Sequence, residues 1–253
     1  MKLLPFGILL CAIVPCCLGE ETKAESVPQL YQVVVEQTAR KIAITLVIFS
    51  DRDFAVRIVD NAEPNHASKY LNLANAMESN GCVAGCNGGF FNRLPFVPVG
   101  GMISDGKRIN SVDPTTWMKG LLVVRNGRQT LESSESYRDT PAVTELLQSG
   151  IWLVREGKPA SDPDQTKAAR RTIICHDGQG TWAIGASERC TFSELARALK
   201  SPEIMAVIVV QDALNFDGGP STGLWLKRDP DNFYLAEKWA VRNFIGIAPR
   251  STQ

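Results

Sequence analysis

The chain has 253 residues, with 27 basic and 27 acidic side chains, 44% hydrophobic residues and two histidines. This apolar content and balanced charge exclude a disordered chain, and the length suits one large domain or two small ones. A net charge of zero also argues against nucleic-acid binding through the field of the whole protein, and we predict no nucleic-acid partner.

The first 19 residues have the layout of a secretory signal peptide. Lys2 supplies a positive start, residues 3–18 form an uncharged apolar run, and a polar segment follows Gly19. The run is shorter than the ~20 apolar residues of a membrane span, and Pro5 and Pro15 interrupt it. We predict a signal peptide at 1–19, an exported protein that is periplasmic or extracellular, and no membrane span beyond the signal peptide. An uncleaved anchor is the alternative.

Cleavage after Gly19 would remove three of the seven cysteines and leave Cys82, Cys86, Cys175 and Cys190. An even number of cysteines in an exported chain is typical of a disulfide framework. We predict local pairing, of Cys82 with Cys86 and of Cys175 with Cys190. A zinc site at the Cys-x-x-x-Cys spacing is the competing interpretation, but no second close pair or nearby histidine accompanies it. We predict no metal site and no cofactor.

In the first part of the mature chain, runs of Val, Ile and Thr predict strands. Apolar residues at helical spacing follow, with Gly81 as a stop signal, and a short buried strand then leads into a glycine loop. We predict strands at 31–38, 41–50, 54–59, 82–84, 120–125 and 150–156, and a helix at 64–79.

In the second part of the chain, the turn at 176–180 predicts a hairpin of strands 171–175 and 181–185. Thr191 and Glu194 fit a capping box for a helix that extends to about residue 200. Further strands are predicted at 204–210, 224–226 and 244–248, and the polar segment 159–167 is predicted as a loop and a flexible flap. Together these elements predict an α+β fold, a single domain over 20–253 built on mixed β-sheet with about three helices.

Two glycine loops follow apolar runs. The first is Asn87-Gly88-Gly89-Phe90-Phe91-Asn92, and the second is Asn215-Phe216-Asp217-Gly218-Gly219-Pro220-Ser221-Thr222-Gly223. Glycines permit positive φ and the close approach of backbone N–H groups to a ligand. Plain turns are the alternative interpretation of each loop. Because both loops carry asparagine and follow an apolar run, we expect them to meet at one site.

Arg170-Arg171-Thr172 enters a predicted strand. An arginine at a strand end can hold a carboxylate or phosphate through two hydrogen bonds. A solvated pair of charges is the alternative interpretation.

Several common catalytic sites are excluded by the sequence. A Ser–His–Asp triad needs a histidine, and only His66, near a predicted helix start, and His176, in the hairpin turn, are present. The chain also has no Gly-x-Ser-x-Gly elbow, no Gly-x-x-x-x-Gly-Lys-Ser/Thr loop and no His-Glu-x-x-His motif.

These motifs, in this order, resemble the phosphodiester glycosidase family, which includes the lysosomal uncovering enzyme and bacterial exopolysaccharide-associated proteins. The resemblance covers about residues 82 to 248 and rests on the segments 87–91, 147–154, 171–172, 194–196 and 215–221. It implies hydrolysis of a sugar-1-phosphodiester in a phosphate-linked sugar or glycan substrate.

The resemblance implies catalytic roles for Asp217, Arg171 and Asn87. Asp217 would act at the anomeric carbon or its water, as nucleophile or general base, and Arg171 would bind the phosphate together with backbone N–H groups of the glycine loops. Asn87 and Ser221 would orient substrate oxygens. The implied substrate-binding residues are Gly88, Gly89, Asn92, Thr172, Asn215, Gly218, Gly219 and Ser221.

The chain departs from the family pattern at Pro220, where the family usually has a third glycine, and at Phe216, where it has leucine. Proline has no N–H, so an amide contact to phosphate would be lost there. A non-catalytic glycan- or phosphate-binding protein on the same fold is therefore the alternative function, and a metal-dependent hydrolase is a third. No pattern in the sequence defines the oligomeric state.

Overall fold

A computed structural model describes residues 26–37, 40–65, 67–160 and 167–251. The predicted signal peptide at 1–19 lies outside these ranges, as do residues 161–166 of the predicted loop. Within them, no helix is long and apolar enough to cross a membrane.

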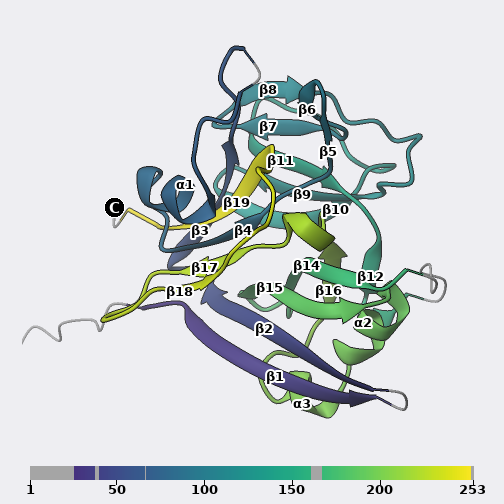
Figure 1. Cartoon of the computed structure of the whole chain (residues 1–253). Helices are drawn as coiled ribbons and strands as arrows, with labels where there is room; N and C mark the ends of the chain where they lie inside the picture. Colours follow the sequence, from purple (N-terminus) through teal and green to yellow (C-terminus); the bar gives the residue numbers. More distant parts are fainter. Residues whose placement is uncertain (1–25, 38–39, 66, 161–166, 252–253) are drawn as a thin grey trace, which may run out of the picture.

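Three antiparallel sheets form most of the described chain (Figure 1). The seven-stranded sheet has the order β1-β2-β15-β14-β16-β12-β13. The sheet that we call the β11 sheet has the order β10-β9-β11-β7-β8, and the β4 sheet has the order β18-β17-β4-β19-β3. β5 and β6 form a separate pair.

The strands and helices confirm the predicted α+β class. The strands are Gln29–Gln37 (β1), Arg40–Ser50 (β2), Phe54–Asp60 (β3), Ala84–Asn87 (β4), Phe91–Arg93 (β5), Phe96–Pro98 (β6), Met102–Ser104 (β7), Lys107–Asn110 (β8), Gly120–Arg125 (β9), Arg128–Ser133 (β10), Val143–Ser149 (β11), Trp152–Arg155 (β12), Lys158–Pro159 (β13), Ala169–His176 (β14), Thr181–Cys190 (β15), Asp212–Asn215 (β16), Leu224–Leu226 (β17), Phe233–Leu235 (β18) and Asn243–Pro249 (β19). The α-helices of the described ranges are Leu73–Ser79 (α1), Phe192–Ala198 (α2) and Pro202–Met205 (α3), with a 3-10 turn, η1, at Gly219–Ser221.

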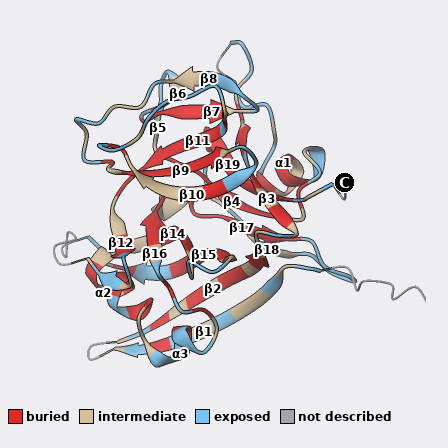
Figure 2. Ribbon diagram, turned by 180° about the vertical axis from the view of Figure 1, so that it is seen from behind, coloured by how far each residue is buried: buried red, intermediate tan, exposed pale blue. Residues whose placement is uncertain are grey.

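The main hydrophobic core lies where the three sheets face one another, and buried strands fill the centre of the molecule in Figure 2. β2 shows how the sequence builds it. Val47 and Phe49 face this core, whereas Ile44 and Leu46 face the other side of the sheet, which α2 and α3 cover. Successive side chains of a strand point to opposite faces, so the apolar run of β2, interrupted only by Thr45, packs into both layers.

The helix predicted at 64–79 is confirmed only in its last part, as α1. The side chain of Asn72 caps α1 by accepting a hydrogen bond from the backbone N–H of Asn75, at 2.9 Å. The preceding segment is held in a non-helical path by Asn61, whose side chain accepts from the Tyr70 N–H and donates to the Val241 carbonyl. Asparagine side chains compete with helical hydrogen bonds in this way.

The capping box predicted for α2 is confirmed, because Thr191 and Glu194 exchange the two expected hydrogen bonds. The strand predicted at 204–210 is wrong. Ser201 caps α3 with Pro202 in its first turn, and the buried Ile204 and Ile208 have helical spacing. A short apolar run does not distinguish a buried strand from a buried helical turn, and the strand of this region, β16, lies after the run.

The predicted disulfides are wrong: within the described ranges the cysteines are free, buried thiols. Cys175 lies opposite Ala183, whereas Cys190 lies opposite Ala169, six residues along β14. At ~3.3 Å per residue this separation is about 20 Å, far beyond the ~7 Å limit for bridged Cα atoms. Burial raises the pKa of the Cys175 thiol to about 12, so these thiols stay protonated.

Glu145, on β11, is buried and joins two sheets. Its Oε2 atom accepts hydrogen bonds from the backbone N–H groups of Ile58, at 3.0 Å, and Asp105, at 3.3 Å. Burial raises the pKa of this carboxyl to about 7, against the opposing effect of the two N–H donors. The folded protein therefore binds the proton more tightly than the unfolded chain does.

We expect Glu145→Gln to change how stability depends on pH. A raised pKa stabilises the fold fully below the ordinary glutamate pKa, and this contribution is lost as the pH rises through about 7. Between pH 5 and pH 8 the wild type should lose up to about 3 kcal/mol that the neutral variant keeps. Guanidinium unfolding of both proteins at the two pH values measures this. Equal losses would contradict the assignment.

Candidate active site

The two glycine loops meet, as expected, where the end of β4 contacts β14 and the segment after β16. Asn87, the last residue of β4, is 1% exposed and connects them. Its Nδ2 atom donates to the Asp217 carbonyl at 2.7 Å, and its Oδ1 atom accepts from the Thr172 hydroxyl at 2.6 Å and from the Gly223 N–H at 3.1 Å. One amide side chain therefore fixes three segments of the site.

The hydrogen-bonding capacity of Asn87 is fully used inside the protein. A side-chain amide has two N–H donors and two acceptor lone pairs. The second Nδ2 contact goes to the Gly88 carbonyl, at 3.4 Å. Asn87 therefore positions the glycine loops, and Thr172 in turn fixes Asn87; neither side chain has a free donor for a substrate oxygen.

Gly88 and Gly89 are required for close packing, not for positive φ. A Cβ atom on Gly88 would lie 2.0 Å from Oδ1 of Asn243. The Gly88 N–H donates to the Asn243 carbonyl at 2.9 Å, and the Gly89 N–H donates to Asn243 Oδ1 at 2.7 Å. Both amides are therefore held by the first residue of β19, so they are not available to bind a phosphate.

Asp217 follows β16 and is half-buried. Its Oδ1 atom accepts from the Gly218 N–H at 2.8 Å, and its carboxylate is also hydrogen-bonded by the Ser221 side chain. Burial raises the pKa of the Asp217 carboxyl, and these two hydrogen bonds oppose the rise. Such an environment favours the protonated form more than water does, as is common for carboxyl groups at functional sites.

The 3-10 turn η1 begins two residues after Asp217, with Gly218 as its N-cap. Gly219 has φ of +61°, and a Cβ there would meet nothing within 4 Å, so the backbone angle is what favours glycine. Gly219 and Pro220 begin the turn, where backbone N–H groups have no acceptor within it. The Gly219 N–H has no hydrogen-bond partner among the described residues, and Pro220 has no N–H; the Pro220 carbonyl accepts from the Lys238 N–H at 2.7 Å.

The arginine pair on β14 points in two directions. Arg171 is 7% exposed; its Nε atom donates to the Cys190 carbonyl at 3.1 Å, and its guanidinium lies 3.7 Å from the ring centroid of Phe192. Arg170 lies on the same face as Thr172 and donates from Nη2 to the Thr222 carbonyl at 2.7 Å. The geometry thus places Arg170, and not the predicted Arg171, beside the glycine loops.

Two other predicted residues do not project into this cluster. Asn92 is exposed on β5. Asn215 is buried, with Nδ2 donating to the Phe216 carbonyl and Oδ1 lacking a hydrogen-bond partner in the described ranges. Sequence reasoning also missed Asn243, which holds both glycines of the first loop; a polar residue directly before the apolar run 244–248 was its only signal.

The site is thus defined by one carboxylate, one arginine and a glycine-rich backbone held by buried amides. No group of three or more metal-ligating side chains gathers anywhere in the residues that the structure describes. Chemically, an arginine can bind an anionic ligand, and a carboxylate beside it can act as an acid, a base or a nucleophile.

A model of the phosphodiester glycosidase family matches residues 80–248. The chain belongs to this family. No curated protein matches the chain in sequence.

Solved structures share the fold at low sequence identity. The zebrafish N-acetylglucosamine-1-phosphodiester alpha-N-acetylglucosaminidase catalytic domain, auto-inhibited by its pro-peptide, is 18% identical, with a TM-score of 0.66 over 91% of this chain and 85% of that one. A hypothetical protein from Synechocystis is 16% identical, with a TM-score of 0.62 over 88% and 62% of the two chains. A protein from Burkholderia pseudomallei described as exported is 12% identical, with a TM-score of 0.56 over 83% and 74%.

Replacement of Asn87 should destabilise the whole fold. Asn87→Ala leaves the Thr172 hydroxyl, the Gly223 N–H and the Asp217 carbonyl without their partner in a buried region. We expect a loss of about 2–4 kcal/mol in the free energy of unfolding, measured by chemical denaturation. The matched control is Asn92→Ala on exposed β5, which should change stability by less than about 0.5 kcal/mol. A similar small change for both variants would show that Asn87 does not join the loops.

Proposed function

We propose that the protein is an exported hydrolase that cleaves a sugar-1-phosphodiester in a phosphate-linked sugar or glycan. The observation that carries this proposal is the position of Asp217 and Arg170 on either side of η1. Gly218 packs against the Arg170 carbonyl, where an added Cβ would lie 2.5 Å away, and the Arg170 guanidinium binds Thr222 just after the turn. A carboxylate and a cation are thus held at one short backbone turn.

Arg170 would neutralise the scissile phosphodiester. Its guanidinium is partly buried, and burial lowers its pKa, but arginine stays charged at any physiological pH. Among the described residues, the one hydrogen-bond partner of this guanidinium is the Thr222 carbonyl, which accepts from Nη2. The remaining guanidinium N–H groups, with the Gly219 N–H, can donate to phosphate oxygens and stabilise the negative charge that develops on the leaving group.

Asp217 would act at the anomeric carbon. When the carbon–oxygen bond to phosphate breaks, its electron pair leaves with the phosphate monoester, which is weakly basic and needs little protonation. A water oxygen then completes the bond to the anomeric carbon, and its proton passes to a base. Asp217 serves either as that base or first as the nucleophile, and Ser221 and Gly218 orient its carboxylate.

Asp217→Asn should lower kcat for a sugar-1-phosphodiester by about 10²–10⁴-fold. Folding should remain intact, because the raised pKa shows that the buried site disfavours the carboxylate charge that the substitution removes. Release of free sugar from a panel of sugar-1-phosphate methyl diesters measures the effect. Asp231→Asn, at an exposed aspartate, is the control and should keep the wild-type rate. Equal rates for both variants would remove Asp217 from the mechanism.

The two arginines should behave differently. Arg170→Gln should lower kcat/KM by about 10²-fold with little loss of stability, because it removes the cation from the phosphate. Arg171→Gln should instead cost about 1–2 kcal/mol of stability, because it weakens the contacts with Cys190 and Phe192. Steady-state kinetics and thermal unfolding of both variants separate the two effects. The reverse pattern would assign the phosphate to Arg171.

A non-catalytic binding protein is the second candidate, and Pro220 favours it. The proline removes an outward N–H from the turn where a phosphate would bind. This function requires saturable binding of a sugar-1-phosphodiester without release of sugar over the whole panel. Turnover of any diester rules it out.

A further inference from the structure

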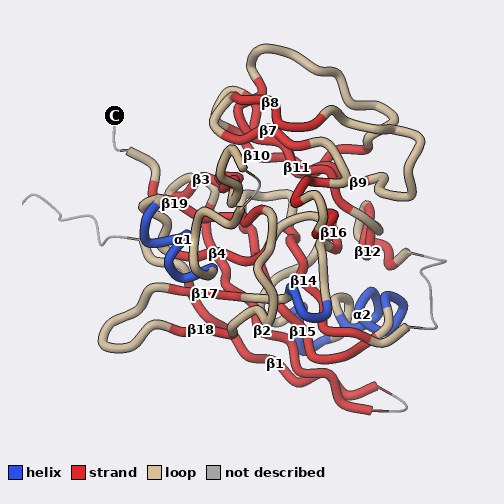
Figure 3. The backbone as a smooth tube through the Cα atoms, turned by 45° about the horizontal axis from the view of Figure 1, so that its top comes forward, coloured by secondary structure: helices blue, strands red, loops and turns tan. Residues whose placement is uncertain are grey.

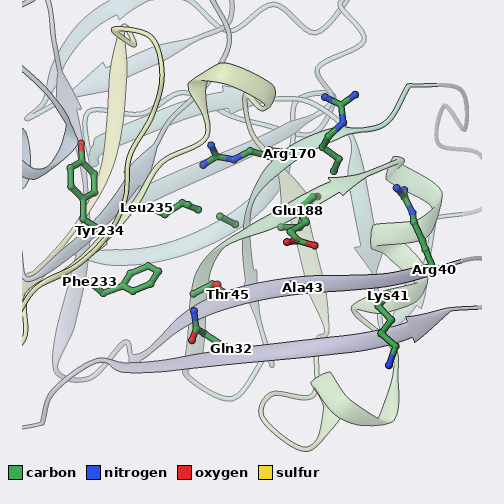
Figure 4. A pocket seen from close by; sticks show the side chains of 13 residues that line it. Gln32, Arg40, Lys41, Ala43, Thr45, Arg170, Glu188, Phe233, Tyr234 and Leu235 are labelled. Carbon is green, nitrogen blue, oxygen red and sulfur yellow. Dashed lines mark hydrogen bonds between the residues drawn. The ribbon is translucent and has the colours of Figure 1, made fainter.

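A groove of about 720 Å³ opens beside Arg170, between the seven-stranded sheet and the β17–β18 hairpin (Figure 4). The hairpin lies alongside β2 in both views of the whole chain (Figures 1 and 3). Small side chains, Ala43, Thr45 and Ala186, form the floor, and Phe233 faces them from the hairpin. Because these floor side chains are small, the space between them and Phe233 stays open.

The strand register connects this groove to the candidate site. Thr172 pairs with Ala186, Ala186 pairs with Thr45, and Thr45 pairs with Gln32. Residues that are directly paired in an antiparallel sheet point to the same face. The row therefore starts at the Thr172 that binds Asn87 and runs outward along the groove floor, so a ligand leaving the site past Arg170 enters the groove.

A β-bulge brings charged side chains together where the candidate site meets the groove. Ala169 pairs with Cys190 and Arg171 pairs with Ser187, so two residues of β15, Glu188 and Arg189, lie opposite Arg170 alone. A bulge inserts one extra residue, so two residues of the bulged strand lie opposite one residue of its partner. Arg170, Glu188 and Arg189 all line the groove, and Glu188 and Arg189 are exposed.

The positive charge at this boundary is only partly compensated. Arg40, which also lines the groove, is paired with Glu194. In contrast, Arg170 donates to the Thr222 carbonyl and Arg189 donates to the Ala168 carbonyl at 3.0 Å. Neither forms an ion pair within the described ranges, and Glu188 is the one carboxylate among the described residues that line the groove.

Lys41 completes the basic lining, but it forms an ion pair with Glu36, and its side chain points away from the floor in Figure 4. The proposed function assigns Arg170 to the scissile phosphate. Arg189 is then the remaining cation of the groove that has no acidic partner among the described residues. The groove offers an apolar wall, a narrow floor and one further cation at its inner end.

We propose that this groove binds the leaving part of the substrate, and that this part is a chain that carries a second phosphate, bound by Arg189. The proposal rests on the proposed hydrolase function, since it places the scissile phosphate at Arg170. The carbon atoms of the chain pack along Phe233, and its second phosphate accepts charge-assisted hydrogen bonds from the Arg189 guanidinium. The substrate class is thus a sugar linked through phosphate to a polyanionic chain.

The test compares matched probes on the full chain. The probes are N-acetylglucosamine 1-phosphate diesters of alkyl chains of two to six carbons, which end either in a phosphate or in a hydroxyl. Calorimetry with Asp217→Asn, in which cleavage is slow, measures binding, and the wild type provides kcat/KM. We expect the best phosphate-ended probe to bind at least about tenfold more tightly than its hydroxyl partner.

Arg189→Gln, added to Asp217→Asn, should bring the ratio of the two Kd values to about one. Glu188→Gln should raise the same ratio by about two- to fivefold, because it removes the carboxylate opposite the arginines. This second variant tests the groove even if Arg189→Gln fails to fold. Lys107→Gln, at an exposed lysine of β8, is the control and should leave the ratio unchanged.

The outcomes separate the two proposals. Equal binding of the phosphate- and hydroxyl-ended probes overturns the proposal that the groove binds a second phosphate, whatever the rate of hydrolysis. A preference that depends on Arg189, without sugar release by the wild type, supports the groove and overturns the hydrolase. Absence of binding of either probe, together with absence of sugar release by the wild type, overturns both.

Discussion

The site depends on the saturation of one buried amide. Asn87 uses all of its donors and acceptors on Thr172, Gly223, Gly88 and the carbonyl of Asp217. These partners come from both the β4 sheet and the seven-stranded sheet, so the relative position of the two sheets sets the geometry of the Asp217 carboxylate. Loss of any partner would leave a buried polar group unpaired, which costs more than the net value of one hydrogen bond. Any other arrangement of the loops would leave such groups unpaired, so the same cost favours this single arrangement.

The sequence predicted the elements well where a local signal determined them. The hairpin of β1 and β2, the hairpin of β14 and β15, and the capping box of α2 all follow from alternation or from capping side chains. The run at 204–210 was misassigned because Ile204 and Ile208 are equally compatible with a strand and with a helical turn. The pairing of Cys175 with Cys190 failed for a different reason: closeness in sequence across a hairpin says nothing of distance when strands are long and the pairing register separates the two residues.

The segments that form the candidate site could be predicted from the sequence, but the directions of their side chains could not. Both glycine loops and Asp217 were identified from residue types, and the loops do meet. Which arginine faces them depends on strand parity: Thr172 faces Asn87, so Arg170 shares its side and Arg171 does not. A bulge in β15 then decides what lies opposite Arg170. Neither fact is encoded in the Arg-Arg-Thr motif itself. Asn243 was missed because its role, binding the amides of Gly88 and Gly89, arises only when β19 pairs with β4.

These contacts restrict how an anion can be recognised here. The amides of Gly88 and Gly89 are already bound to Asn243, and the Gly218 amide is bound to Asp217. Pro220 has no amide to give. Of the amides of these glycines, only that of Gly219 has no hydrogen-bond partner among the described residues, so the backbone alone cannot neutralise a phosphodiester. With a net charge of zero over the chain, the field of the whole protein cannot do so either. Under the proposed function, recognition therefore requires side-chain cations next to the turn, and Arg170 is such a cation, fixed by Thr222 on the face that bears Thr172.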